Sequence, residues 1–204
     1  MMKPEFSYGD VEKFYELCDD AYRCWKIRRV LFDDNSKIEA MLSISDPARY
    51  CFAELGCVLQ EAVIIKISKI HDKAHDKYNN YNLSMQFILD NCGKITPELN
   101  LLANNLSSFY NKIKSARHKF CAHNSRAEIF EGGFLGRFDE NEDVEYFAKL
   151  QQFVNGIAKI FGKEVLPFYE KVTTEAEELL QAVLLGLDAL YGREEGVIPP
   201  SPAP

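Results

Sequence analysis

The sequence predicts an all-α protein folded as a helical bundle. Apolar residues recur every three or four positions along nearly the whole chain, which is the periodicity of amphipathic helices. Helix start signals recur between these stretches, and no internal repeat is visible. A content of 47% hydrophobic and 27% charged residues is typical of globular domains and excludes global disorder. At roughly 150 residues per domain, we expect one helical domain over residues 1–192 and a disordered, proline-rich tail over 193–204.

Two long helices are expected in the N-terminal third. The first runs from about Asp10 to Leu31 and has a single apolar face, made of Val11, Phe14, Tyr15, Cys18, Tyr22 and Trp25. Residues 33–45 have no clear pattern. Asp46 and Pro47 then read as the cap and the first position of a helix that continues to about His71. Because this helix is apolar over a wide arc, we expect it at the centre of the bundle.

A polar stretch and a third and fourth helix come next. Residues 71–82 are polar and predict a loop, after which Asn82 or Ser84 caps a short helix that ends near Cys92. Thr96, Pro97 and Glu98 supply a cap, a first-position proline and an acid near the positive helix end. The helix that starts there reaches at least Arg117 and carries an apolar stripe of Leu99, Leu102, Ala103, Leu106, Tyr110 and Ile113.

The C-terminal part alternates between helices and breaks. Residues 127–138 contain Gly132 and Gly133 between short apolar pairs, which predicts a short hairpin or an irregular loop. A helix is expected over about 143–161, and Pro167 breaks or kinks the chain after it. Thr174 and Glu177 have the spacing of a capping box, which predicts the start of a last helix that ends near Tyr191.

Several classes of protein and site are disfavoured. No segment approaches the ~20 apolar residues of a membrane span, and no signal peptide is visible, so we expect a cytoplasmic protein without membrane partners. The six cysteines are then best interpreted as buried thiols. His71 and His75 are four apart, as in zinc-binding helices, but no third ligand is evident, and a solvated helix end is favoured. Without a glycine-rich phosphate loop either, we expect no metal and no cofactor.

The charge is distributed unevenly along this acidic chain. The net charge is −7, which excludes a wholly cationic nucleic-acid coat. Residues 99–127 nevertheless contain no acid and carry a local charge of +5, from Lys112, Lys114, Arg117, Lys119 and Arg126. Cations that complement a helix C-terminus explain one or two of these charges. A surface that faces an anion explains both the cations and the missing acids.

Arg117 and His123 stand out within this basic segment. The apolar stripe of the preceding helix extends to positions 116, 117 and 120, which puts Arg117 at the edge of the packed face. Arginine at such an edge is either a paired structural ion or a guanidinium available to phosphate or carboxylate. His123 lies six residues later, about 120° around a continuous helix. The two side chains therefore converge only if the helix ends between them or if another surface completes the site.

The segment Arg117-His118-Lys119-Phe120-Cys121-Ala122-His123 resembles the Arg-polar-x(3–5)-His signature of the HEPN superfamily. His118 matches the polar residue after the motif arginine, and Ala122 matches the small residue before the motif histidine. The long apolar helix with Ile64–Ile70, the polar loop and Asn82-Leu83-Ser84 resemble the abortive-infection, phage-exclusion branch. The resemblance covers roughly residues 47–160. It implies a HEPN-type bundle of four core helices plus additional helices.

The resemblance implies a metal-independent endoribonuclease of a toxin–antitoxin or phage-defence system. Attack by the RNA 2′-OH needs a base, an acid for the leaving oxygen and a cation for the charged phosphorane. Histidine suits both proton transfers and arginine suits the phosphorane. A homodimer that places two motifs face to face would supply Arg117 and His123 twice as catalytic residues. His118 would be an auxiliary donor, and flanking phosphates would contact Lys112, Lys114, Lys119 and Arg126.

A second function remains open at this point. Other HEPN proteins are catalytically inactive scaffolds or partners of a nucleotidyltransferase. By that resemblance, the chain would be a helical module that binds a partner protein, such as a nucleotidyltransferase antitoxin, through the same groove. The overall acidity of the chain counts against broad RNA affinity and favours this alternative.

Overall fold

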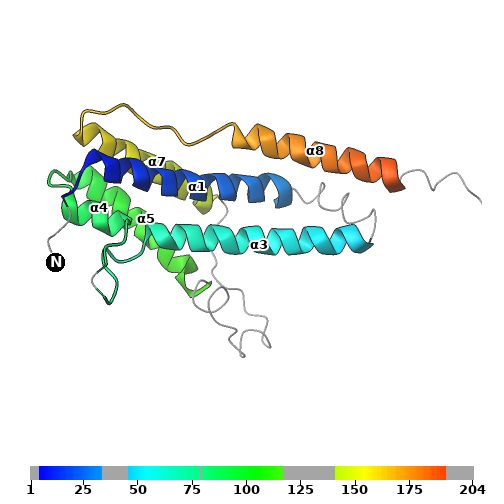
Figure 1. Cartoon of the computed structure of the whole chain (residues 1–204), viewed down its shortest axis with the longest axis horizontal. Coiled ribbons are helices and arrows are strands. Elements are labelled where there is room, and N and C mark those ends of the chain that lie inside the picture. Colours follow the sequence, from blue (N-terminus) through cyan, green and yellow to red (C-terminus); the bar gives the residue numbers. More distant parts are fainter. Residues whose placement is uncertain (1–4, 34–45, 79, 117–140, 192–204) are drawn as a thin grey trace, which may run out of the picture. The chain divides into compact units, whose positions relative to one another are not determined.

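The computed structural model describes residues 5–33, 46–78, 80–116 and 141–191, and Figure 1 shows the helices in chain order. The described residues form helices and no strand, with one isolated antiparallel bridge between His75 and Tyr81. The prediction of an all-α fold is therefore confirmed. The predicted hairpin over 127–138 and the tail over 193–204 lie outside the described residues. The helices are α1 (Tyr8–Phe32), α3 (Asp46–Ile70), α4 (Met85–Asn91), α5 (Pro97–Ala116), α7 (Glu142–Ile160) and α8 (Val172–Tyr191).

The chain divides into two compact units. The first unit comprises Met1–Cys24 and Glu61–Glu170, and the second comprises Trp25–Gln60 and Lys171–Pro204. Helices α1 and α3 each contribute residues to both units, whereas α4, α5 and α7 belong to the first and α8 to the second. A single domain over 1–192 stays a prediction.

Helix starts follow the capping chemistry at two of the four predicted sites. At a third site, α3 includes Asp46 as its first residue, one position before the predicted start at Pro47. Ser84 caps α4 by accepting a hydrogen bond from the Phe87 N–H at 3.2 Å, and Thr96 caps α5 by accepting from the Leu99 N–H at 3.3 Å. The capping box predicted at Thr174 is wrong, because α8 already begins at Val172. Thr174 therefore lies inside the first turn, whereas a capping residue precedes the first helical residue.

The core of the first unit is apolar and aromatic. Helix α7 buries one face completely, and its largest contributors are Tyr146, Phe147, Leu150, Phe153 and Ile157. Helix α5 packs against α7, and its predicted stripe is buried at every position except the half-buried Leu102. The two helices approach closely at Gly156, where a Cβ atom would lie 2.5 Å from the Leu99 Cδ2. Leu106 at the middle of α5 has no exposed surface.

The second unit has a smaller core. Leu31 and Leu180 are its buried centre, and six partly buried side chains pack against them: Ile27, Phe32, Phe52, Leu59, Val183 and Leu184. Trp25, the only tryptophan of the chain, is 4% exposed, and the cations of Lys26 and Arg29 lie over its ring at 5.3 and 5.5 Å.

The N-terminal half of α3 departs from the expectation of a central helix. Tyr50, Leu55 and Val58 are 80, 42 and 53% exposed, so the expected central burial is wrong over this half. The reason is geometric, because the small core of the second unit accepts one stripe of α3 while its apolar residues extend around a wider arc. From Val63 to Ile70, within the first unit, the inward face of α3 is buried as expected.

The cysteines follow the same division. Cys18, Cys24 and Cys92 are buried thiols, as predicted, whereas Cys51 and Cys57 are exposed on the N-terminal half of α3. The prediction of burial is therefore wrong for these two, for the same geometric reason. Cys121 lies outside the described residues. Among the described helices, none is long and apolar enough to cross a membrane.

Candidate functional site

The candidate motif begins at the C-terminal end of α5. This helix ends at Ala116, and Arg117 is the next residue in the sequence. Arg117, His118, Lys119, His123 and Arg126 all lie outside the described residues, so the predicted geometry between them stays a prediction. The structure does describe the C-terminal half of α5, which directly precedes the motif.

The C-terminal half of α5 is firmly packed. Phe109, Tyr110 and Ile113 are all less than 9% exposed, and Ile113 precedes the motif arginine by only four residues. The ring of Phe109 stacks on the ring of Tyr146 from α7, with 4.7 Å between centroids. Packing on this face leaves little freedom for rotation of α5 about its axis. The point at which the chain leaves α5 is therefore defined by the core.

His71 joins three elements next to this half of α5. It directly follows α3, and its ring lies parallel to the Tyr110 ring, with 4.6 Å between centroids and 4° between planes. Its Nε2 atom lies 3.0 Å from the Tyr146 hydroxyl on α7. The His71 imidazole thus lies at the end of α3 and contacts both α5 and α7. It therefore joins the C-terminal half of α5, which precedes the motif, to the core.

The hydrogen bond at His71 joins two neutral groups. Burial lowers the pKa of His71 to about 3, because the imidazolium would lose its hydration without gaining a carboxylate partner. Burial also raises the pKa of Tyr146 well above its ordinary value. Neither group is therefore charged at neutral pH. His71 is a structural residue in this position, and a proton shuttle at neutral pH is not its chemistry.

The structure also bears on the histidine pair considered as zinc ligands. Helix α3 ends at Ile70, so His71 and His75 do not share a helix face. His71 is directed at Tyr110 and Tyr146, whereas His75 lies against Tyr81, with 5.6 Å between ring centroids. Over the described part of the chain, no group of three histidine, cysteine, aspartate or glutamate side chains is arranged to hold a metal ion.

Two of the predicted phosphate-binding cations are described. Lys114 is exposed on α5. Lys112 forms an ion pair with Glu142, the first residue of α7, beside a hollow of about 150 Å³ between the two helices. The sequence did not reveal this pairing, because Glu142 lies beyond the acid-free segment of residues 99–127 over which the charges were counted. A phosphate that reaches Lys112 would have to compete with a carboxylate.

A family model describes this chain. The model for the HEPN AbiU2 group matches residues 10–180, which includes all of α3 to α7 and the segment that carries Arg117 and His123. The chain belongs to the HEPN AbiU2 family. It is thus an abortive-infection-associated HEPN domain, and the resemblance seen in the motif and in the helix order is confirmed over a longer stretch than expected. Comparison with curated proteins and with solved structures gives no match.

Proposed function

We propose that this protein is a metal-independent endoribonuclease of a toxin or phage-defence system. The observation that carries the proposal is an Arg-His-x(4)-His sequence directly after the packed end of α5, within a chain of the HEPN AbiU2 family. The absence of acids between Glu98 and Glu128 supports an anionic substrate, because a phosphate approaching the motif meets no carboxylate from the same segment.

The chemistry uses the nucleophile that RNA itself provides. His123 removes the proton of a 2′-OH, and the 2′-oxygen attacks the adjacent phosphorus. The Arg117 guanidinium stabilises the two charged oxygens of the phosphorane. The bond from phosphorus to the 5′-oxygen then breaks, and that oxygen receives a proton from His123 of the partner subunit. The products are a 2′,3′-cyclic phosphate and a free 5′-hydroxyl, so a metal-bound water is not required.

A homodimer provides the two histidine protonation states that this reaction needs. In a two-fold dimer the motifs of both copies line one groove, which brings a base and an acid to opposite sides of the same phosphorus. His118 acts as an auxiliary hydrogen-bond donor. Lys114, Lys119 and Arg126 hold flanking phosphates without reading bases, and Lys112 joins them when phosphate displaces Glu142.

RNA cleavage in the presence of EDTA tests the proposal. Purified wild-type protein is expected to cleave single-stranded RNA at a rate that EDTA does not change. His123→Ala and Arg117→Ala each lower the single-turnover rate by at least about 100-fold, because each removes a group that acts only in the transition state. Lys159→Ala is the control, since it removes an exposed cation of α7 that lies outside the basic segment. This control is expected to cleave at the wild-type rate.

Two results would contradict the proposal. Cleavage that persists in His123→Ala removes this histidine from the mechanism and points to a contaminating nuclease. A wild-type protein that binds a co-purified antitoxin but cleaves no RNA after its removal supports the inactive helical module instead.

A further inference from the structure

The loop of residues 71–82, between α3 and α4 in Figure 1, is tightly organised by one carboxylate. Asp76 Oδ1 accepts hydrogen bonds from the backbone N–H groups of Tyr78 and Asn80, at 2.8 and 2.9 Å. Its Oδ2 accepts a third from the Asn80 side-chain amide, at 2.9 Å. These bonds from Asn80 lower the pKa of Asp76 below its ordinary value. The carboxylate is therefore charged at neutral pH and is engaged by the loop itself.

Backbone pairing closes the base of the same loop. The Asp76 N–H donates to the Asn80 carbonyl at 3.0 Å, and the Asn82 N–H donates to the Ala74 carbonyl at 2.9 Å. The Asn82 side chain adds a bond to the Lys73 carbonyl, also at 2.9 Å. Ala74 is 4% exposed and seats the loop on the core. The described residues of the loop, 71–78 and 80–82, are thus held in place by hydrogen bonds within the chain.

This ordered loop presents aromatic rings to solvent. Tyr78 is 71% exposed and Tyr81 is 40% exposed. The Lys77 ammonium lies 4.9 Å from the centre of the Tyr78 ring, and the His75 ring lies beside Tyr81. Burial in the core therefore does not account for Tyr78. A ring held in water by a preorganised loop is available for stacking.

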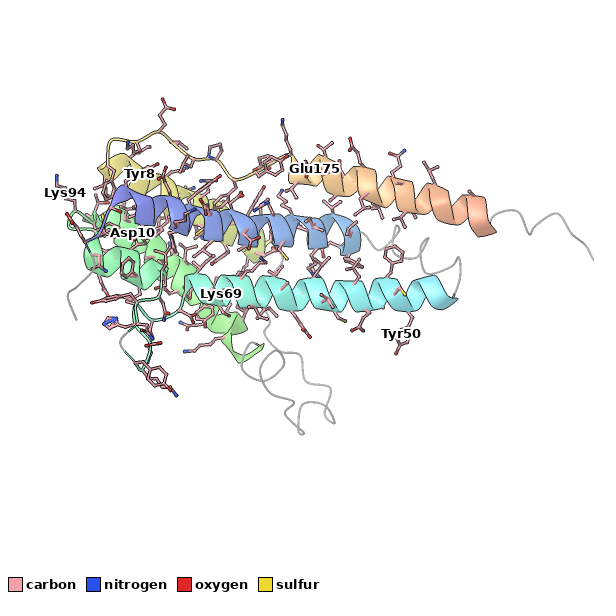
Figure 2. The ribbon with its side chains drawn as sticks, viewed as in Figure 1. Tyr8, Asp10, Tyr50, Lys69, Lys94 and Glu175 are labelled. Atoms are coloured by element: carbon pink, nitrogen blue, oxygen red, sulfur yellow. The ribbon has the colours of Figure 1, made fainter. Side chains whose placement is uncertain are left out.

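The exposed charges nearest to the rings are lysines, whereas the two acids of the loop, Asp72 and Asp76, are only partly exposed. Lys69, Lys73 and Lys77 recur every four residues, and all three are exposed. Lys69 lies in the last turn of α3, before the loop, and is labelled in Figure 2. Asp76 faces into the loop, where its oxygens accept three hydrogen bonds. Exposed rings interleaved with cations favour a ligand that offers flat bases and phosphates.

The loop also contacts the C-terminal half of α5, which precedes the motif. Its first residue, His71, is the imidazole that stacks on Tyr110 of α5 and contacts Tyr146 of α7. The loop and the C-terminal half of α5 therefore share one anchoring point in the first unit.

We propose that the 71–82 loop is a stacking platform for single-stranded RNA, on which a base packs against Tyr78 while Lys73 and Lys77 contact phosphates. This proposal rests on the ribonuclease function and names single-stranded RNA as its substrate class. Stacking on an aromatic side chain recognises any unpaired base, because every base has a π-face. Bases paired in a duplex are not available to Tyr78.

RNA affinity measured without cleavage tests the platform. The background is His123→Ala, and the probe is a fluorescein-labelled, single-stranded RNA of mixed sequence and about 12 nucleotides, followed by anisotropy. Tyr78→Ala is expected to weaken the Kd at least about fivefold, since stacking contributes ~1–3 kcal/mol per base. Tyr78→Phe keeps the ring and stays within about twofold of the parent. Tyr50→Ala, which removes the 80%-exposed tyrosine of α3, is the matched control and also stays within about twofold.

Salt dependence separates stacking from charge. Lys77→Ala is expected to reduce the slope of log Kd against log salt by about 0.7, the value for one phosphate contact on a single strand. Tyr78→Ala leaves that slope unchanged while it weakens binding at every salt concentration. Replacing the probe with a duplex abolishes the effect of Tyr78→Ala.

The outcomes distinguish this proposal from the catalytic one. Equal losses in Tyr78→Ala and Tyr50→Ala, or no loss in either, would overturn the platform while cleavage by the wild type stands. Binding that depends on Tyr78 in a protein that never cleaves RNA would support the platform and refute the ribonuclease. If the protein binds no RNA, or if the loop binds a protein partner in place of RNA, the platform is wrong.

Discussion

At the scale of single residues, the contacts that support the motif come from partners far away in the sequence. His71 and Tyr146 are 75 positions apart, yet they share a hydrogen bond beside the C-terminal half of α5. The sequence favoured a solvated helix end over a metal site for His71, and this is wrong for His71, because its ring stacks on Tyr110 and its Nε2 atom contacts Tyr146. A histidine with a tyrosine partner on another helix has no local signature, which is why sequence reasoning did not find it.

Removing the Tyr146 hydroxyl should destabilise the protein more than removing a hydroxyl at the surface. Tyr146→Phe leaves the partly buried His71 nitrogen without its tyrosine partner, and an unpaired polar group in a buried site costs ~1–3 kcal/mol. Tyr15→Phe is the matched control, because its hydroxyl donates to the Pro167 carbonyl at a more exposed position. Urea unfolding measures both variants. Equal losses would mean that the His71 contact contributes nothing beyond an ordinary hydrogen bond.

The low pKa of His71 should make the free energy of unfolding depend on pH. An unfolded histidine titrates near 6.5, whereas the folded one titrates at about 3. Between these values the unfolded state binds more protons, so stability falls as the pH decreases from 6.5 towards 3. Lowering the pH from 7 to 5 should therefore remove about 2 kcal/mol through this group.

Urea unfolding at pH 7 and pH 5 checks this expectation. His71→Gln should lose less stability over that interval than the wild type, because the titrating group is gone. His75→Gln is the control, because it makes the same substitution at an exposed histidine. If His71→Gln showed the same pH dependence of stability as the wild type, the pH dependence would not come from the lowered pKa of His71.

At the scale of elements, local chemistry predicted most helices and missed the packing around them. Ser84 and Thr96 cap α4 and α5 because a side-chain oxygen near the first N–H groups is a local event. The exposure of Tyr50 and Val58 on α3 depends on how many helices cover that stretch, which periodicity does not encode. The pairing of Lys112 with Glu142 likewise depends on the packing of α5 against α7.

A glycine comparison tests the close approach of α5 and α7. Gly156 and Gly186 are both inside helices, where alanine gains up to about 1 kcal/mol over glycine. Gly186 has open space around the position of a Cβ, so Gly186→Ala should raise the Tm. In Gly156→Ala the new methyl group meets the buried Leu99 at 2.5 Å, and Leu99 has to shift. Its Tm should therefore lie clearly below that of Gly186→Ala, and equal gains would contradict the packing.

At the scale of the whole molecule, the proposed reaction requires two copies of the chain. Arg117→Ala and His123→Ala are each expected to be inactive as homodimers. A mixed dimer of wild type and His123→Ala keeps one histidine where the reaction uses two, so co-refolding the wild type with an excess of this variant should lower cleavage far more than dilution does. Wild type co-refolded with the same excess of Lys159→Ala is the control. Cleavage that falls only in proportion to the diluted wild type, in a mixture that contains mixed dimers by mass, would show that the two histidines do not act across the interface.

The two compact units raise the separate question of whether they unfold together. The buried ring of Trp25 belongs to the second unit, and the chain has no other tryptophan. Its fluorescence therefore reports on the second unit, and no dye has to be attached to the protein. Far-ultraviolet circular dichroism instead averages over the helices of both units. A fluorescence transition that precedes the dichroism transition would reveal a partly folded state in which the motif-bearing unit survives alone.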